Sequence, residues 1–211
     1  MSAYQKSTAR EYFESIVIAI ILALFIRTWV VQAFKIPTGS MENNLLVGDH
    51  LLVNKFVNAP TAWGFERALM PVREIHRGDV IVFKYPEDPE RDFIKRVIGL
   101  PGETLELRNK VVYINGRPLT EPYVHYLLAA GAVPPSDPRE NYGPVTVPPG
   151  YYFMMGDNRD NSTDSRWWSF LSKDYVKGRA MMVYWSYEPG EGGWGSVVTG
   201  TRWNRLFHQI H

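Results

Sequence analysis

Residues 111–120 read VVYINGRPLT. The pair Asn115-Gly116 lies between the runs VVYI and RPLT. An Asn-Gly pair is a common two-residue connection of a β-hairpin, because both residues readily adopt the positive φ angles that such a turn requires. The stretch therefore predicts two antiparallel strands joined by a tight turn.

Short apolar runs bounded by Gly, Pro, Asn or Asp recur along the chain after residue 34. They lie at 50–53, 80–83, 93–98, 151–154 and 180–185. Many short strands separated by turns predict a mostly β domain with an antiparallel sheet. Residues 118–148 are rich in proline, and we interpret them as an insertion or extended loop. The segment 188–211, rich in Gly and Trp, is either a loosely packed surface tail or an interfacial contact.

The amino-terminal segment has a different pattern. Residues 15–25 read SIVIAIILALF, and after Arg27 the chain continues WVVQAF. A helix over 13–34 would be roughly 33 Å long at about 1.5 Å per residue, enough to cross a hydrocarbon core of ~30 Å. Arg27 would lie off-centre, where its aliphatic stem lets the charge reach the headgroups. We therefore predict a single transmembrane helix over 13–34.

Two other interpretations of this segment remain open. A buried core helix is one, although a run that is apolar on all sides is unusual in a soluble domain of this size. A cleavable secretory signal is the other, with Lys6 and Arg10 before the apolar run and Val31-Gln32-Ala33 resembling a cleavage site. Arg27 stands between the apolar run and that site, which argues against cleavage.

The composition excludes several classes of function. The chain has 211 residues, a formal net charge of +1 and no cysteine. A charge so close to zero lacks the basic footprint of a nucleic-acid binder, so no nucleic-acid partner is predicted. The absence of cysteine excludes disulfides, thiolate metal sites and cysteine nucleophiles. The five histidines show no HExxH motif and no recognisable triad spacing, and we predict no metal or cofactor.

Lys95 lies in the predicted strand DFIKRVI, residues 92–98. Side chains alternate along a strand, so Lys95 shares a locally apolar face with Phe93 and Val97, while Arg96 points to the other face. One interpretation is an edge lysine that protects the strand from further pairing. The other is a desolvated amine, whose lowered pKa would let it act as a general base.

Two further segments are polar where turns are expected. Ser40 lies in IPTGSM, residues 36–41, directly after the predicted membrane exit, and taken alone this segment is best interpreted as a turn. Residues 156–166 read GDNRDNSTDSR and follow the strand-like YYFMM. A solvated loop with Asx-turns would explain such a run, whereas the spacing does not fit a calcium-binding loop.

Four motifs in this order resemble the bacterial type I signal peptidases, also called leader peptidases. They are PTGSM (37–41), RGDVIVFKYPEDP (77–89), DFIKRVIGLPGE (92–103) and GDNRDNSTDSR (156–166). The resemblance covers about 13–108 and 143–188 together with the closing RLFHQIH. The eleven-residue GDNRDNSTDSR together with FIKR carries most of it.

The resemblance implies a Ser–Lys dyad, in which Ser40 is the nucleophile and Lys95 the general base. It implies that the Thr38 hydroxyl and the Ser40 backbone N–H stabilise the oxyanion. Ser162 would orient the lysine amine, with Asp164 and Arg166 as a supporting ion pair behind it. The shallow pockets for small substrate side chains would be lined by Phe34, Ile36, Val82 and Ile94.

The function implied is removal of amino-terminal signal peptides from exported preproteins, with cleavage after small residues of the Ala-X-Ala type. Residues 1–12 would be cytoplasmic, 13–34 the anchor, and 35–211 an extracytoplasmic β-rich peptidase domain on a bacterial cytoplasmic (inner) membrane. Expected partners are preproteins and the lipid bilayer, with proximity to the secretion translocon. An alternative from another class is a non-catalytic membrane-anchored β-module that binds exported chains.

Overall fold

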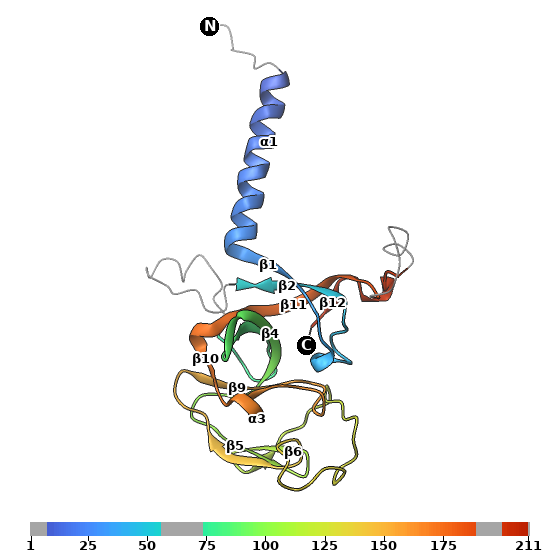
Figure 1. Cartoon of the computed structure of the whole chain (residues 1–211). Coiled ribbons are helices and arrows are strands. Elements are labelled where there is room, and N and C mark those ends of the chain that lie inside the picture. Colours follow the sequence, from blue (N-terminus) through green and yellow to red (C-terminus); the bar gives the residue numbers. More distant parts are fainter. Residues whose placement is uncertain (1–7, 56–73, 189–199, 211) are drawn as a thin grey trace.

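Two antiparallel sheets follow the amino-terminal helix in the computed structural model of this chain (Figure 1). The structure describes residues 8–55, 74–188 and 200–210. The larger sheet has the strand order β1 (Val31–Lys35), β2 (Asp49–Asn54), β11 (Val176–Ser186), β3 (Val80–Tyr85), β4 (Asp88–Gly99), β9 (Tyr151–Met155) and β10 (Leu171–Ser172), and β12 (His208–Gln209) pairs with β11. The smaller has the order β7 (Arg117–Pro118), β6 (Val111–Ile114), β5 (Thr104–Arg108) and β8 (Tyr142–Thr146).

The mostly β, antiparallel prediction is confirmed, and each predicted apolar run lies within a strand, whereas the predicted strand RPLT (117–120) is limited to Arg117–Pro118. The hairpin at Asn115-Gly116 joins β6 to β7, with Ile114 paired to Arg117. Asn115 and Gly116 have φ angles of 50° and 77°, as a two-residue hairpin turn requires. Turn chemistry and alternation therefore located these strands from local sequence alone.

Residues 118–148, interpreted as an insertion or extended loop, contain a strand at their carboxyl end. Residues 142–146 form β8, which pairs with β5 and completes the smaller sheet. Val147, next along the chain, is fully buried in the core beneath that sheet. Pro144 fits because β8 is an edge strand, where a residue without an N–H removes no ladder hydrogen bond on the open side.

The helix predicted over 13–34 has different boundaries. It begins at Thr8 and ends at Phe25 (α1), and a π-helical turn, η1 (Ile26–Val30), leads directly into β1. Residues 31–34 are extended because their backbone pairs with β2, from Val31 opposite Asn54 onward. Among the described residues, no helix combines the length and the apolar character needed to span a membrane.

Three clusters of buried side chains form the core, and the first of them lies nearest the amino-terminal strand. It contains Ile36, Met41, Leu45, Leu51, Val53, Val80, Val82, Ile94, Ala180 and Val183, with Phe34 and Ile210 packed against it. Of the predicted tail, residues 200–210 are ordered onto the sheet through β12 and through an ion pair of 2.6 Å between Arg205 and Asp49. The loosely packed tail is therefore wrong for 200–210, and 189–199 lie outside the described residues.

Candidate active site

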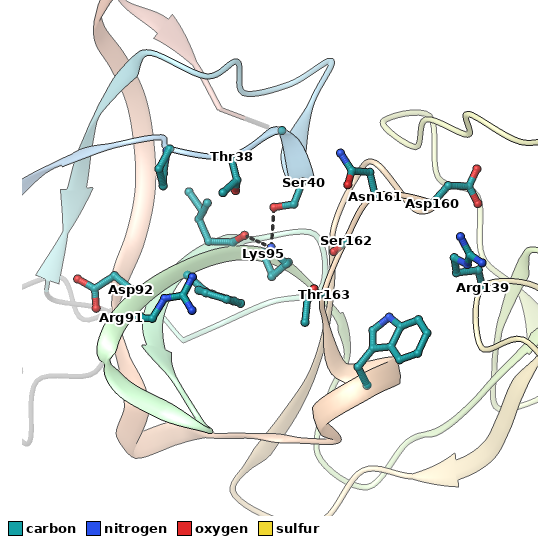
Figure 2. A pocket seen from close by; sticks show the side chains of 15 residues that line it. Thr38, Ser40, Arg91, Asp92, Lys95, Arg139, Asp160, Asn161, Ser162 and Thr163 are labelled. Atoms are coloured by element: carbon teal, nitrogen blue, oxygen red, sulfur yellow. Dashed lines mark hydrogen bonds between the residues drawn. The ribbon is translucent and has the colours of Figure 1, made fainter. Parts of the chain in front are cut away.

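A cavity of about 660 Å³ opens where the turn before residue 41, the strand β4 and the polar loop 156–166 meet (Figure 2). It is lined by Pro37, Thr38, Gly39, Ser40, Arg91, Asp92, Phe93, Ile94, Lys95, Arg139, Asp160, Asn161, Ser162, Thr163 and Trp167. Four segments that lie far apart in the sequence, the fourth of them around Arg139, therefore contribute to one site.

Ser40 lies in a single 3₁₀ turn, η2 (Gly39–Met41), which begins directly after the extended residue Thr38. Met41, next to Ser40, is fully buried and fixes the turn against the core. The polar loop holds the turn from the other side, because Asn158 N–H donates to the Ser40 carbonyl at 3.2 Å and Asn158 Nδ2 to the Gly39 carbonyl at 3.3 Å. The Ser40 hydroxyl is thus held at the cavity wall.

Lys95 reaches the same point from β4, and the predicted strand alternation explains its direction. Its Nζ lies 2.6 Å from Ser40 Oγ and donates to the Ile94 carbonyl at 3.1 Å (Figure 2). The side chain is only 3% exposed, and its amine lies 5.2 Å from the centre of the Phe93 ring. The hydroxyl and the amine are therefore within direct proton-transfer distance.

Burial lowers the pKa of Lys95 from its ordinary value of 10.5 to about 8, because the charged ammonium loses its hydration. The charges of Asp164 and Asp157 oppose this change and that of Arg166 adds to it. None of the described carboxylates forms an ion pair with Lys95. Near neutral pH a useful fraction of the amine is therefore uncharged.

Ser162 lines the cavity and is 9% exposed, and its hydroxyl helps to lower the pKa of Asp164. The structure therefore brings Ser162 to the site, but it does not include a hydrogen bond from Ser162 to the Lys95 amine.

Gly156 is a site residue that the sequence analysis did not identify. A Cβ on Gly156 would lie 2.3 Å from Ser162 Oγ and 2.5 Å from the Ser40 carbonyl oxygen, so only glycine lets the loop approach the turn this closely. The signal in the sequence was its place at the start of the polar run, directly after a strand.

Asp164 and Arg166 form a fully buried ion pair at the start of α3 (Ser165–Trp168). Arg166 donates from Nε and Nη2 to the two Asp164 oxygens, each at 2.8 Å, and its Nη2 also bonds the Arg159 carbonyl. Burial favours the neutral acid, but the Arg166 guanidinium outweighs it and the pKa of Asp164 is lowered. Because Gly156 N–H also donates to Asp164, the pair fixes the loop behind Lys95.

Of the remaining predicted residues, some line the cavity and others do not. Thr38 is exposed and lines the cavity beside Ser40 (Figure 2). Ile94 also lines it, whereas Phe34, Ile36 and Val82 do not and instead pack with Ile94 in the first core cluster. Reasoning from sequence missed several lining residues altogether: Arg91, Arg139, Asp160, Asn161 and Trp167.

Comparison with known proteins gives a family. A family model described as "Signal peptidase, peptidase S26" matches residues 9–185. The chain belongs to this family. Signal peptidase I from Pseudomonas aeruginosa is 36% identical over 181 residues, a match that covers 75% of this chain and 63% of that protein. Signal peptidase I from Bacillus amyloliquefaciens is 34% identical over 184 residues, which cover 87% of this chain and 89% of that protein.

A solved structure also resembles this family member. The crystal structure of a signal peptidase I from Enterococcus faecalis V583 is 36% identical in sequence, with a TM-score of 0.42 over 51% of this chain and 97% of that one. Within the described part of the chain, no three His, Asp or Glu side chains are grouped in a way that could hold a metal ion.

Proposed function

We propose that this chain is a serine endopeptidase that removes signal peptides from exported preproteins, with Ser40 as nucleophile and Lys95 as general base. The observation that carries the proposal is the distance of 2.6 Å between Ser40 Oγ and a buried lysine amine with a lowered pKa. The neutral amine takes the hydroxyl proton as Ser40 attacks the scissile carbonyl. Lys95 then protonates the leaving amine, and a water activated by Lys95 releases the acyl group.

The remaining groups act on charge and orientation. The oxyanion that forms after attack is stabilised by the Ser40 backbone N–H and by the Thr38 hydroxyl. Thr38 lines the cavity next to Ser40, which fits this role. Ser162 orients the Lys95 amine, and the Asp164–Arg166 pair holds the loop that carries Ser162.

The substrate binds as an added strand at the open edge of β4. β3 pairs with β4 over residues 88–96 and β9 pairs with its other edge over residues 96–99, so among the described strands this other edge is unpaired over 88–95. An extended peptide bonded there would lie across Ser40, with its side chains directed at Ile94. Phe34, Ile36 and Val82 pack with Ile94 in the first core cluster, and a pocket bounded by such side chains would favour small residues, as in Ala-X-Ala.

The amino-terminal helix α1 associates with a lipid bilayer in this proposal. It exposes large apolar side chains over much of its length: Tyr12, Phe13, Ile16, Val17, Ile18, Ile20, Ile21, Leu22, Leu24 and Phe25. A continuous apolar surface of this kind requires an apolar partner. The peptidase domain then lies on the extracytoplasmic side of a bacterial cytoplasmic membrane, near the secretion translocon, where preproteins emerge.

Cleavage of a synthetic preprotein tests this function. The full chain in detergent or lipid is incubated with a preprotein that carries one Ala-X-Ala site, and the cut position is read by mass spectrometry. We expect Ser40→Ala and Lys95→Ala to abolish cleavage while folding is retained, and the exposed-site controls Ser136→Ala and Lys84→Ala to remain active. Binding without any cleavage by the wild type would instead favour a non-catalytic module.

A further inference from the structure

The cavity extends beyond Ser40 and Lys95 in two opposite directions (Figure 2). Arg91 and Asp92 form one end, and Arg139 and Asp160 lie at the other, with the serine and the lysine between them. A peptide cleaved at Ser40 must therefore place its signal part at one end and its mature part at the other.

The Arg91–Asp92 end lies beside the strand that continues from the amino-terminal helix. Lys177 connects the two, because its Nζ bonds Asp92 at 2.7 Å and lies 5.9 Å from the centre of the Phe34 ring on β1. If α1 lies in lipid next to the signal segment, as the proposed function requires, the signal segment enters from this end. The mature chain then leaves past Arg139 and Asp160.

The exit end is rigid before any substrate binds. Asp160 forms a buried ion pair of 2.7 Å with Lys110 and accepts N–H groups of Leu127 and Leu128 at 2.8 Å. Arg159, next to Asp160, forms an ion pair with Glu121 that is almost fully buried. The segment 118–141 is thereby fastened to the polar loop, so the wall that it contributes to the cavity is preformed.

Trp167 adds an aromatic side chain to this cavity, and its neighbour Arg166 ties α3 to the polar loop by bonding the carbonyl of Arg159, the residue before Asp160, at 2.7 Å. Trp167 lies in α3 between the buried residues Arg166 and Trp168, yet it is itself 52% exposed and lines the cavity. The charge of Arg139, which lines the same end, is already compensated by Asp137 through contacts of 2.7 and 3.0 Å. The half-exposed indole of Trp167 and the amide side chain of Asn161 are uncharged groups that line the same cavity.

We propose that Trp167, with Asn161 and Arg139, forms a subsite for the first residues of the mature chain and favours an aromatic or large apolar side chain there. Aromatic and apolar groups gain most from contact with a half-exposed indole. Asn161 offers an amide donor and acceptor to the extended backbone. The subsite also gives the segment around Arg139 a role in substrate selection.

Substrates that vary only after the cleavage site test the subsite. The parent preprotein carries Gly at the first three mature positions, and three derivatives carry Phe at one of them. We expect the wild type to cleave at least one derivative with kcat/KM roughly fivefold above that of the parent. Trp167→Ala and Trp167→Leu should both bring that ratio close to one, and circular dichroism checks that both variants are folded.

The matched control is Trp203→Ala, which removes an exposed tryptophan on η5 (Trp203–Arg205) outside the cavity and should leave the ratio unchanged. The subsite is refuted if no derivative is preferred, or if the preference survives in both Trp167 variants. Failure of the proposed function is a separate result, because it would appear as cleavage by Ser40→Ala or as no cleavage of any substrate by the wild type.

Discussion

Lys95 and Arg96 are consecutive buried basic residues on β4 that point to opposite faces of the strand. The two faces differ in the partners that they offer to the basic group. On one face, Lys95 is 3% exposed and has a serine hydroxyl and a carbonyl as its neighbours. On the other face, Arg96 is 1% exposed and donates to both oxygens of Asp157, at 2.8 and 2.7 Å. It also bonds the Gly78 carbonyl and lies 4.0 Å from the centre of the Tyr123 ring.

The difference shows how one strand can supply both a reactive and a fixed group. An unpaired lysine in an apolar site loses charge readily, whereas a guanidinium stays charged and needs a carboxylate when buried. Asp157 also accepts from Asn44 Nδ2 at 3.0 Å, so the Arg96 face fastens β4, the polar loop and the segment after Ser40 to one another. The rigidity of the Arg96 face positions the groups on the Lys95 face.

Removal of the carboxylate that pairs with Arg96 should have the largest effect on stability. Asp157→Asn preserves shape but leaves a buried guanidinium uncompensated, so we expect the free energy of unfolding to fall by about 3–5 kcal/mol. Urea unfolding measures the loss. The surface pair of Glu106 with Arg108 provides the control, because Glu106→Gln should cause no measurable loss. A loss below about 1 kcal/mol in Asp157→Asn would show that the Arg96 face does not depend on the pair.

On the Lys95 face, we expect a substitution to increase the free energy of unfolding rather than to decrease it. Lys95→Met should be inactive but more stable than wild type at pH 7, by roughly 3 kcal/mol, because the wild type carries a lysine whose pKa is lowered from 10.5 to about 8. Between these values the unfolded chain binds more protons than the folded chain, so the stability of the wild type rises with pH. The advantage of the variant should therefore shrink from pH 8 upward.

Urea unfolding of both proteins from pH 7 to 9.5 measures that difference. The exposed Lys84 supplies the matched control, and Lys84→Met should show no such dependence on pH. A Lys95→Met variant that is less stable than wild type at pH 7 would contradict a desolvated lysine.

Local sequence predicted one side of this contrast better than the other. Alternation along 93–97 gave the opposite directions of Lys95 and Arg96, and the Asn-Gly turn gave the β6–β7 hairpin. The local sequence did not reveal the partner of Arg96, because Asp157 is brought close to Arg96 only when β4 pairs with β9. β8 was missed for the same reason. Its Pro-containing sequence does not by itself indicate that it pairs with β5.

The site shows the same limit. Motif order placed Ser40, Lys95 and Ser162 in one hypothesis, and the structure brings all three to one cavity. Trp167 and Arg139 could not be assigned to that cavity, because nothing in either segment indicates that α3 and the segment 118–141 face the same opening. The requirement for Gly156 depends on a close approach of two segments, which only the fold supplies.

The smallest expected effect is the pH dependence of cleavage, and it reports on the Lys95 face alone. Only the neutral amine accepts the Ser40 proton, so kcat/KM should rise about tenfold per pH unit below pH ~8 and level off above it. The rise is measured from pH 6 to 9 with a substrate that lacks groups titrating in this range, and Lys84→Met serves as the control. A rise that continued toward the ordinary lysine pKa of 10.5 would mean that burial does not activate the amine, and a flat profile would mean that Lys95 is not the base. Because the pKa follows from the apolar surroundings, a profile levelling near pH 8 would tie catalysis to an amine that forms no ion pair with any described carboxylate, the feature that separates the Lys95 face of β4 from the Arg96 face.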